Sequence, residues 1–136
     1  MSEYNFSPIV TRDSIFRKQM KYIYVYLNDS GDGHIHMYDG MVNLGFNDTV
    51  KINFKYDFEQ KILFLFHHPE FGQTITQVKN DPNHLSVKCN DVFKKIGLMP
   101  LPPKIDGKSN SGKYLSINVL EVDGYKGVIV DLKQFV

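Results

Sequence analysis

The stretch that decides the fold is Ile35-His36-Met37-Tyr38-Asp39-Gly40-Met41-Val42-Asn43-Leu44-Gly45-Phe46, because its pattern recurs 52 residues later. The second occurrence reads Val87-Lys88-Cys89-Asn90-Asp91-Val92-Phe93-Lys94-Lys95-Ile96-Gly97-Leu98. Apolar residues stand at matching positions in both, and one Asp and one Gly are identical. Self-similarity at a fixed offset is typical of a duplicated structural unit. We therefore predict two copies of one unit, the alternative being two unrelated strand–helix–Gly segments.

The same offset extends toward the N-terminus without a gap. Ile23, Asn28 and Asp29 are matched by identical residues, which gives five identities in the 25 pairs from 22–46. Residues 1–21 then form an N-terminal arm with a short helix, 22–72 the first repeat and 73–136 the second. An insertion at 99–113, rich in proline and then in glycine and serine, belongs to the second repeat. The length favours one compact domain overall.

Alternation of apolar and polar residues predicts a mainly β fold with a minor helical part. The expected strands are 22–27, 34–37, 50–56, 61–66, 74–78, 85–89, 114–122 and 125–132, and the expected helical segments are 38–44 and 90–96. Gly45 and Gly97 should end the helical segments with positive φ. The expected shared core is Ile35, Met37, Leu44, Phe64, Val87, Cys89, Ile96 and Val130.

Composition narrows the functional classes. The chain has 136 residues, is 42% hydrophobic and carries a formal net charge of +1, so the overall balance does not favour nonspecific binding to nucleic acid. No apolar run reaches the roughly 20 residues that span a bilayer. The N-terminal residues lack the pattern of a signal peptide. We expect a cytoplasmic protein that does not associate with a membrane.

Groups that could perform catalysis do not form a recognised signature. His34 and His36 share one side of a strand, a spacing that suits a metal, but solvated histidines are the commoner explanation. The single Cys89 is expected in the core. We therefore predict no catalytic residue, no metal and no cofactor, and thus a protein that is not an enzyme.

A row of tyrosines alternates with apolar residues in the strand 22–27. Tyr22, Tyr24 and Tyr26 share one side of it. Such a row can stack on nucleic-acid bases. A second buried face or a contact between subunits is the more common role, so the row leaves the function open.

The order of elements from Tyr24 to Phe66 resembles the swapped-hairpin DNA-binding module of the AbrB, MazE and SpoVT regulators. The resemblance rests on 33–37, Leu44-Gly45-Phe46, Asp48, 50–52 and 61–64. The chain differs at His34, where the family usually has an Arg, and at Tyr38 and Asn90, where it usually has a Pro. The resemblance implies an interlocked swapped-hairpin barrel, with the tandem copies acting as a single-chain pseudo-dimer.

The resemblance also implies a small DNA-binding transcriptional regulator that contacts duplex DNA. The residues expected to contact the phosphates are Arg12, Arg17, Lys18, Lys88, Lys94, Lys95, Lys104 and Lys108. The alternative is a protein-interaction module without DNA contact, such as a regulator or inhibitor of another macromolecule, and the near-neutral charge favours it. The sequence leaves open whether the chain forms a homo-oligomer.

Overall fold

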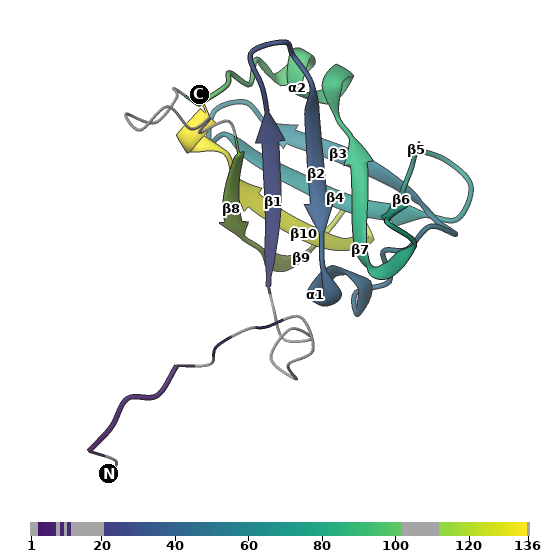
Figure 1. The fold of residues 1–136 in the computed structure, drawn as a ribbon. Coiled ribbons are helices and arrows are strands. Elements are labelled where there is room, and N and C mark those ends of the chain that lie inside the picture. The colour runs from purple at the N-terminus through teal and green to yellow at the C-terminus, as the bar shows by residue number, and fades with distance from the viewer. Residues whose placement is uncertain (1–2, 8, 10, 12–20, 102–111, 136) are drawn as a thin grey trace.

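The computed structural model describes residues 3–7, 9, 11, 21–101 and 112–135, and its architecture is mainly β (Figure 1). The strands are β1 (Tyr22–Leu27), β2 (Gly33–Met37), β3 (Lys51–Asp57), β4 (Ile62–His68), β5 (Gln73–Thr74), β6 (Thr76–Val78), β7 (Asp81–Lys88), β8 (Gly112–Ser116), β9 (Asn118–Val122) and β10 (Tyr125–Asp131). The helices are α1 (Asp39–Val42), α2 (Asn90–Ile96) and the 3-10 turn η2 (Lys133–Phe135).

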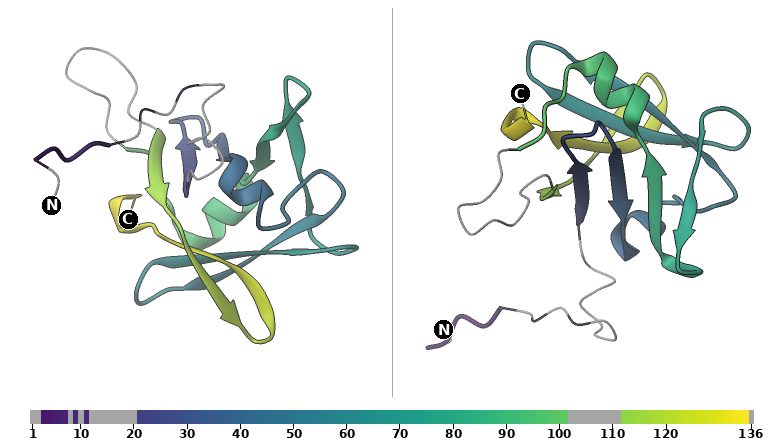
Figure 2. Two further views of the ribbon diagram at one scale, coloured as in Figure 1. Left: turned by 90° about the horizontal axis from the view of Figure 1, so that it is seen from below. Right: turned by 45° about the horizontal axis from the view of Figure 1, so that its top comes forward.

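The strands form two five-stranded antiparallel sheets. Sheet A has the order β6-β7-β2-β1-β8, and sheet B has the order β5-β3-β4-β10-β9. The sheets face each other, with α2 at one end and α1 at the opposite end (Figures 1 and 2). Strand residues alternate between the space inside and the outer surface, so Ile23, Ile35 and Val87 of sheet A meet Leu63 and Val130 of sheet B in one core.

The chain crosses from one sheet to the other at two buried isoleucines. Ile75 separates β5 in sheet B from β6 in sheet A, and Ile117 separates β8 in sheet A from β9 in sheet B. The prediction of unbroken strands at 74–78 and 114–122 was therefore wrong. A strand that turns a corner between packed sheets keeps its apolar alternation, because its inward residues still face the same core.

Each half of the chain repeats one order of elements. The hairpins β1–β2 and β6–β7 lie in sheet A, a helix follows each, and the hairpins β3–β4 and β9–β10 then lie in sheet B. β2 and β7 are antiparallel neighbours, and Ile35 is the register partner of Val87. These two residues are equivalents at the offset read from the sequence, which supports the predicted duplication.

Where apolar residues match each other at this offset, they are buried to similar degrees. The hydrophobic pairs buried on both sides are Ile23 and Ile75, Ile35 and Val87, Met37 and Cys89, Met41 and Phe93, and Phe46 and Leu98. Leu44 and Ile96 are both partly buried against the core. Gly45 and Gly97 have φ of 99° and 71°, which confirms the positive values predicted for them. The first helix is shorter than expected, since α1 covers only four residues.

The predicted core is confirmed at Ile35, Met37, Val87, Cys89 and Val130, whereas Leu44 and Ile96 are partly buried against it and the Phe64 ring lies elsewhere. That ring is buried, but β4 directs it to the outer side of sheet B, opposite Leu63 and Leu65. There it stacks on Phe66 with ring centroids 5.5 Å apart, and Phe66 contacts Tyr125. β4 is thus apolar on both faces, as its sequence predicts, because it lies in the middle of sheet B.

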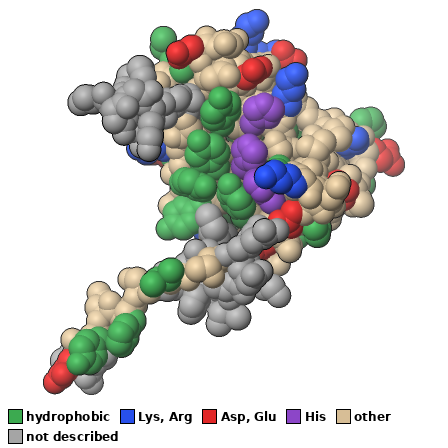
Figure 3. Space-filling view, in the orientation of Figure 1, with side chains coloured by type: hydrophobic (Ala, Val, Ile, Leu, Met, Phe, Trp, Pro, Cys, Tyr) green, Lys and Arg blue, Asp and Glu red, His purple; other side chains and the backbone are tan. Residues whose placement is uncertain are grey.

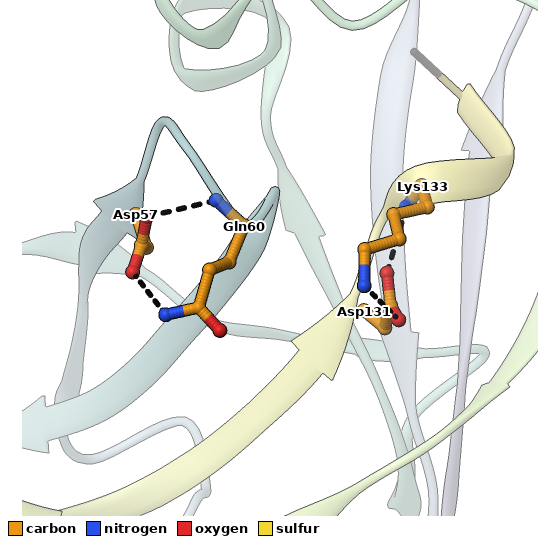
Figure 4. Close-up of polar contacts among 4 residues, drawn as sticks. All are labelled: Asp57, Gln60, Asp131 and Lys133. Carbon is orange, nitrogen blue, oxygen red and sulfur yellow. Dashed lines mark hydrogen bonds and ion pairs between the residues drawn. The ribbon is translucent and has the colours of Figure 1, made fainter.

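Local polar contacts hold the end of sheet B where β4 begins (Figure 4). Asp57 accepts hydrogen bonds from the backbone and side-chain nitrogens of Gln60, at 2.9 and 3.0 Å, and so fixes the turn between β3 and β4. The backbone hydrogen bond from Gln60 lowers the pKa of Asp57 below its ordinary value. At the end of β10, Asp131 accepts the backbone N–H of Lys133 at 2.9 Å, which starts η2.

Candidate functional site

The outer side of sheet A carries a continuous layer of aromatic and imidazole rings. Because Ile23, Val25 and Ile35 face the core, alternation directs the intervening residues outward. The rings in contact there are Tyr24, Tyr26, His34, His36, Tyr38, His84 and Tyr114, and we call them the ring face. Figure 3 shows this surface, where a green band of side chains from the hydrophobic class, which includes tyrosine, lies beside a column of histidines.

Five of these rings form a closed circuit across four strands. The Tyr24 centroid lies 4.8 Å from that of Tyr114 and 5.9 Å from that of His36. The His84 centroid lies 5.1 Å from His36 and 4.9 Å from Tyr38. Tyr38 completes the circuit at 6.3 Å from Tyr114. The register explains the arrangement, since Tyr24 is the cross-strand partner of both Tyr114 and His36.

A glycine gives the central tyrosine room to lie across its neighbouring strand. A Cβ atom at Gly112 would overlap the Tyr24 hydroxyl, so the phenol ring extends over β8 at a position without a side chain. Burial raises the pKa of Tyr24 above its ordinary value, and Tyr114 and Tyr26 raise it further. The Tyr24 hydroxyl therefore stays protonated near neutral pH and can donate a hydrogen bond.

Two imidazoles on the ring face are hydrogen-bonded to each other. The Nδ1 atom of His36 lies 3.0 Å from Nε2 of His84, so one nitrogen donates and the other accepts. Burial lowers the pKa of His36 below its ordinary value, and the neighbouring His84 and His34 lower it further. The His36 imidazole is accordingly neutral at pH 7, and the pair adds no positive charge through it.

This lowered pKa predicts a loss of stability in acid. The unfolded chain takes up a proton at His36 near its ordinary pKa of 6.5, whereas the folded chain does so only at lower pH. The contribution of His36 to the free energy of unfolding is fully present above the pKa that His36 has in the unfolded chain. It is lost as pH falls through the lower pKa that His36 has in the folded chain. Between pH 7.5 and 5.0, urea unfolding midpoints should therefore fall further for the wild type than for His36→Gln. Equal falls would contradict the prediction.

A polar groove adjoins the ring face on the side of β7. Its volume is about 690 Å³, and His34, Ser86 and Lys88 line it together with residues of β5, β6 and the start of α2. Lys88 is exposed and is the register partner of His34, so its side chain projects from the same side of sheet A as the rings. Asp91 also lines the groove and offsets part of this positive charge.

Among the described residues, the three predicted phosphate-contacting lysines line three different hollows. Lys88 lines the groove beside the ring face, Lys94 lines a hollow next to the β1–β2 turn, and Lys95 lines one next to β3 of sheet B. Both α2 lysines are exposed. The other candidates, Arg12, Arg17, Lys18, Lys104 and Lys108, lie outside the described residues.

The described residues give little support to a reactive thiol or a metal site. Cys89 is buried, and burial raises the pKa of its thiol to about 12, so it does not form a thiolate near neutral pH. No group of three or more His, Cys, Asp or Glu side chains in the described part of the chain is placed to hold a metal ion. In the same part, no helix has the length and apolar character that crossing a membrane requires.

Comparisons with protein-family models, with curated proteins and with solved structures found no match to this chain. The resemblance to the AbrB, MazE and SpoVT regulators is thus carried by its sequence pattern alone. The function has to be argued from the surfaces of the molecule.

Proposed function

We propose that the protein binds nucleic acid and that the ring face is its contact surface. The observation that carries this proposal is the layer of seven rings in mutual contact on one side of sheet A, where Tyr114 is exposed and the other six are partly exposed. Aromatic side chains are normally buried, and a large exposed group of them marks an interaction surface. Tyrosine and histidine rings on a sheet are also the groups on which nucleic-acid bases stack.

Charge supports a polyanionic partner at this surface. The two cross-strand rows that contain five of the seven rings, Tyr114–Tyr24–His36–Ser86 and Gly112–Tyr26–His34–Lys88, include no carboxylate. Lys88 stands at the end of the second row. A carboxylate among the rings would repel the phosphates of a bound strand, so its absence from these rows favours nucleic acid.

The narrower form of the proposal is a DNA-binding regulator built as a single-chain swapped-hairpin pseudo-dimer. The twofold repetition of hairpin, helix and hairpin supports it, as does the pairing of Ile35 with Val87. This form of the proposal also includes a closed barrel, which has no support because the strands make two open sheets.

Fluorescence anisotropy with labelled oligonucleotides tests the proposal. Wild-type protein should bind at least one of a DNA duplex, single-stranded DNA and single-stranded RNA at about 50 mM salt, where phosphate contacts are strong. The variant Tyr24→Ala with His36→Ala should bind more weakly. The matched control is Tyr125→Ala with His68→Ala, which removes the same residue types from sheet B and should bind like the wild type. Binding of none of the three ligands would refute the proposal.

The dependence of affinity on salt provides a residue-level prediction. Lys88→Ala should lower the slope of log affinity against log salt by about 1, because it removes one phosphate contact beside the ring face. Lys95→Ala should leave the slope unchanged, since Lys95 lies next to β3 instead. Equal slopes for Lys88→Ala and the wild type would show that Lys88 contacts no phosphate.

The second candidate function is a protein-interaction module. The net charge of +1 favours it, and so does the apolar outer side of sheet B around Phe64, Leu120 and Ile129, where a cavity of about 460 Å³ opens. If no oligonucleotide binds at any salt concentration, this function takes precedence.

A further inference from the structure

We infer that the ring face binds unpaired bases, so that its partner is a single-stranded stretch of DNA or RNA whose bases stack on Tyr24, His36 and Tyr114. The inference rests on the proposed function and specifies the form of nucleic acid that the ring face accepts. It departs from the duplex contact implied by the sequence resemblance.

The width of sheet A argues against a duplex at this surface. Proteins read duplex DNA by placing a helix or a two-stranded ribbon in the major groove, which is about 12 Å wide. Five strands at a spacing of about 4.8 Å span about 19 Å. The rings extend over four of these strands, from β8 to β7, so the face is too broad to enter the groove. In a duplex, moreover, the flat sides of the bases are covered by neighbouring bases.

The rings themselves are available for stacking. Tyr114 is 57% exposed, and Tyr24, His36 and Tyr38 are partly exposed. Because Gly112 has no side chain, the Tyr24 ring lies across β8. Stacking accepts every base, since each one has an aromatic face. A strand without defined sequence could therefore bind here.

Polar atoms around the rings can contact the edges of stacked bases. The Tyr24 hydroxyl can donate, and Ser86 lies in the same cross-strand row, beyond His36. The groove beside β7, with His34 and Lys88 in its wall, continues from this row and provides a place for the sugar–phosphate chain. Unpaired bases expose the edges that such groups recognise.

The test measures binding of oligothymidine, oligouridine and a DNA duplex of the same length to the full chain. The single strands should bind more tightly than the duplex. Tyr24→Leu and Tyr114→Leu, which keep an apolar side chain on the strand but remove the aromatic face, should each weaken single-strand binding roughly 5- to 150-fold. Tyr24→Phe should bind nearly as tightly as the wild type, because it retains the ring.

Two further variants separate stacking from a loss of folding. Gly112→Val keeps every ring but displaces Tyr24, so it should weaken binding like Tyr24→Leu. Tyr125→Leu removes an exposed tyrosine from sheet B and should leave binding unchanged. Circular dichroism melting curves identify any variant that has lost its fold, and the comparison then rests on the remaining variants.

The outcomes distinguish the inference from the proposed function. Binding of either single strand, with the predicted order of variants, supports both, and a preference for oligouridine would indicate contact with the ribose hydroxyl. Tighter binding of the duplex, with no effect of the tyrosine variants, would overturn the inference while the proposed function stands. Failure of all three ligands to bind would overturn both and favour a protein partner.

Discussion

Replacing Phe93 by Ala should lower the free energy of unfolding by about 3–5 kcal/mol, the range expected for a buried Phe that leaves a cavity. Phe93 is 1% exposed and projects from α2 into the core. Its ring closes the end of the sandwich where β2 begins, because a Cβ atom at Gly33 would lie only 2.7 Å from Phe93 Cε2. Urea unfolding measures the loss. A change below about 1 kcal/mol would place the ring outside the core.

A double-mutant cycle with Gly33 tests the contact itself. Gly33→Ala alone should lower the free energy of unfolding by about 1–3 kcal/mol, since the added methyl group overlaps a buried ring. In the Phe93→Ala background the same change should have a much smaller effect, because the space is then free. The coupling free energy should be about 0.5–3 kcal/mol. Additive effects would mean that the two residues are not in contact.

Replacing Gly127 by Ala should also destabilise the protein strongly, by about 1–3 kcal/mol or more. Gly127 lies in β10 opposite Phe66, and a Cβ atom there would overlap the backbone carbonyl oxygen of Leu65 and approach the Phe64 ring to 3.0 Å. A backbone atom in a central strand cannot move aside without breaking neighbouring hydrogen bonds. β10 and β4 would have to separate.

The control for Gly127 is Gly124 in the β9–β10 turn. Gly124 has φ of 84° and no neighbouring atom within 4 Å, so Gly124→Ala tests backbone strain without a steric clash. Hydrogen exchange at β4 should accelerate in Gly127→Ala and stay unchanged in Gly124→Ala. Unchanged exchange in both would show that β10 packs less closely on β4 than the structure indicates.

Local sequence patterns predicted most of the elements because most strands alternate apolar and polar residues and β4 is a short run of apolar residues. The strand 22–27 and the helix 90–96 have the predicted bounds. The prediction failed where backbone pairing with a neighbouring strand overrode the local preference of the residues for a turn. Residues 80–83 resemble a turn, yet β7 begins at Asp81, because Asp81 pairs with Val78 of β6 after a register shift between Gln77 and Val78.

The ring face was only partly predictable for the same reason. The row of Tyr22, Tyr24 and Tyr26 and the outward position of His34 and His36 follow from alternation within one strand. His84 and Tyr114 join them only through the register of β7 with β2 and of β8 with β1. The offset between the two repeats could have revealed the pairing of β7 with β2, since it matches Ile35 of β2 with Val87 of β7. Nothing local in the sequence specifies the pairing of β8 with β1.

The two corner crossings at Ile75 and Ile117 have a consequence for how these molecules associate. A long unpaired strand at the margin of a sheet invites another chain to add to it, which leads to aggregation. Here both margins of sheet A continue into both margins of sheet B, so each outermost strand has only two to five residues before the chain turns away. Growth of either sheet by strand addition from a second molecule is thereby restricted. Among the described residues, the broad outer surface of a sheet is then better suited to self-association than a sheet margin.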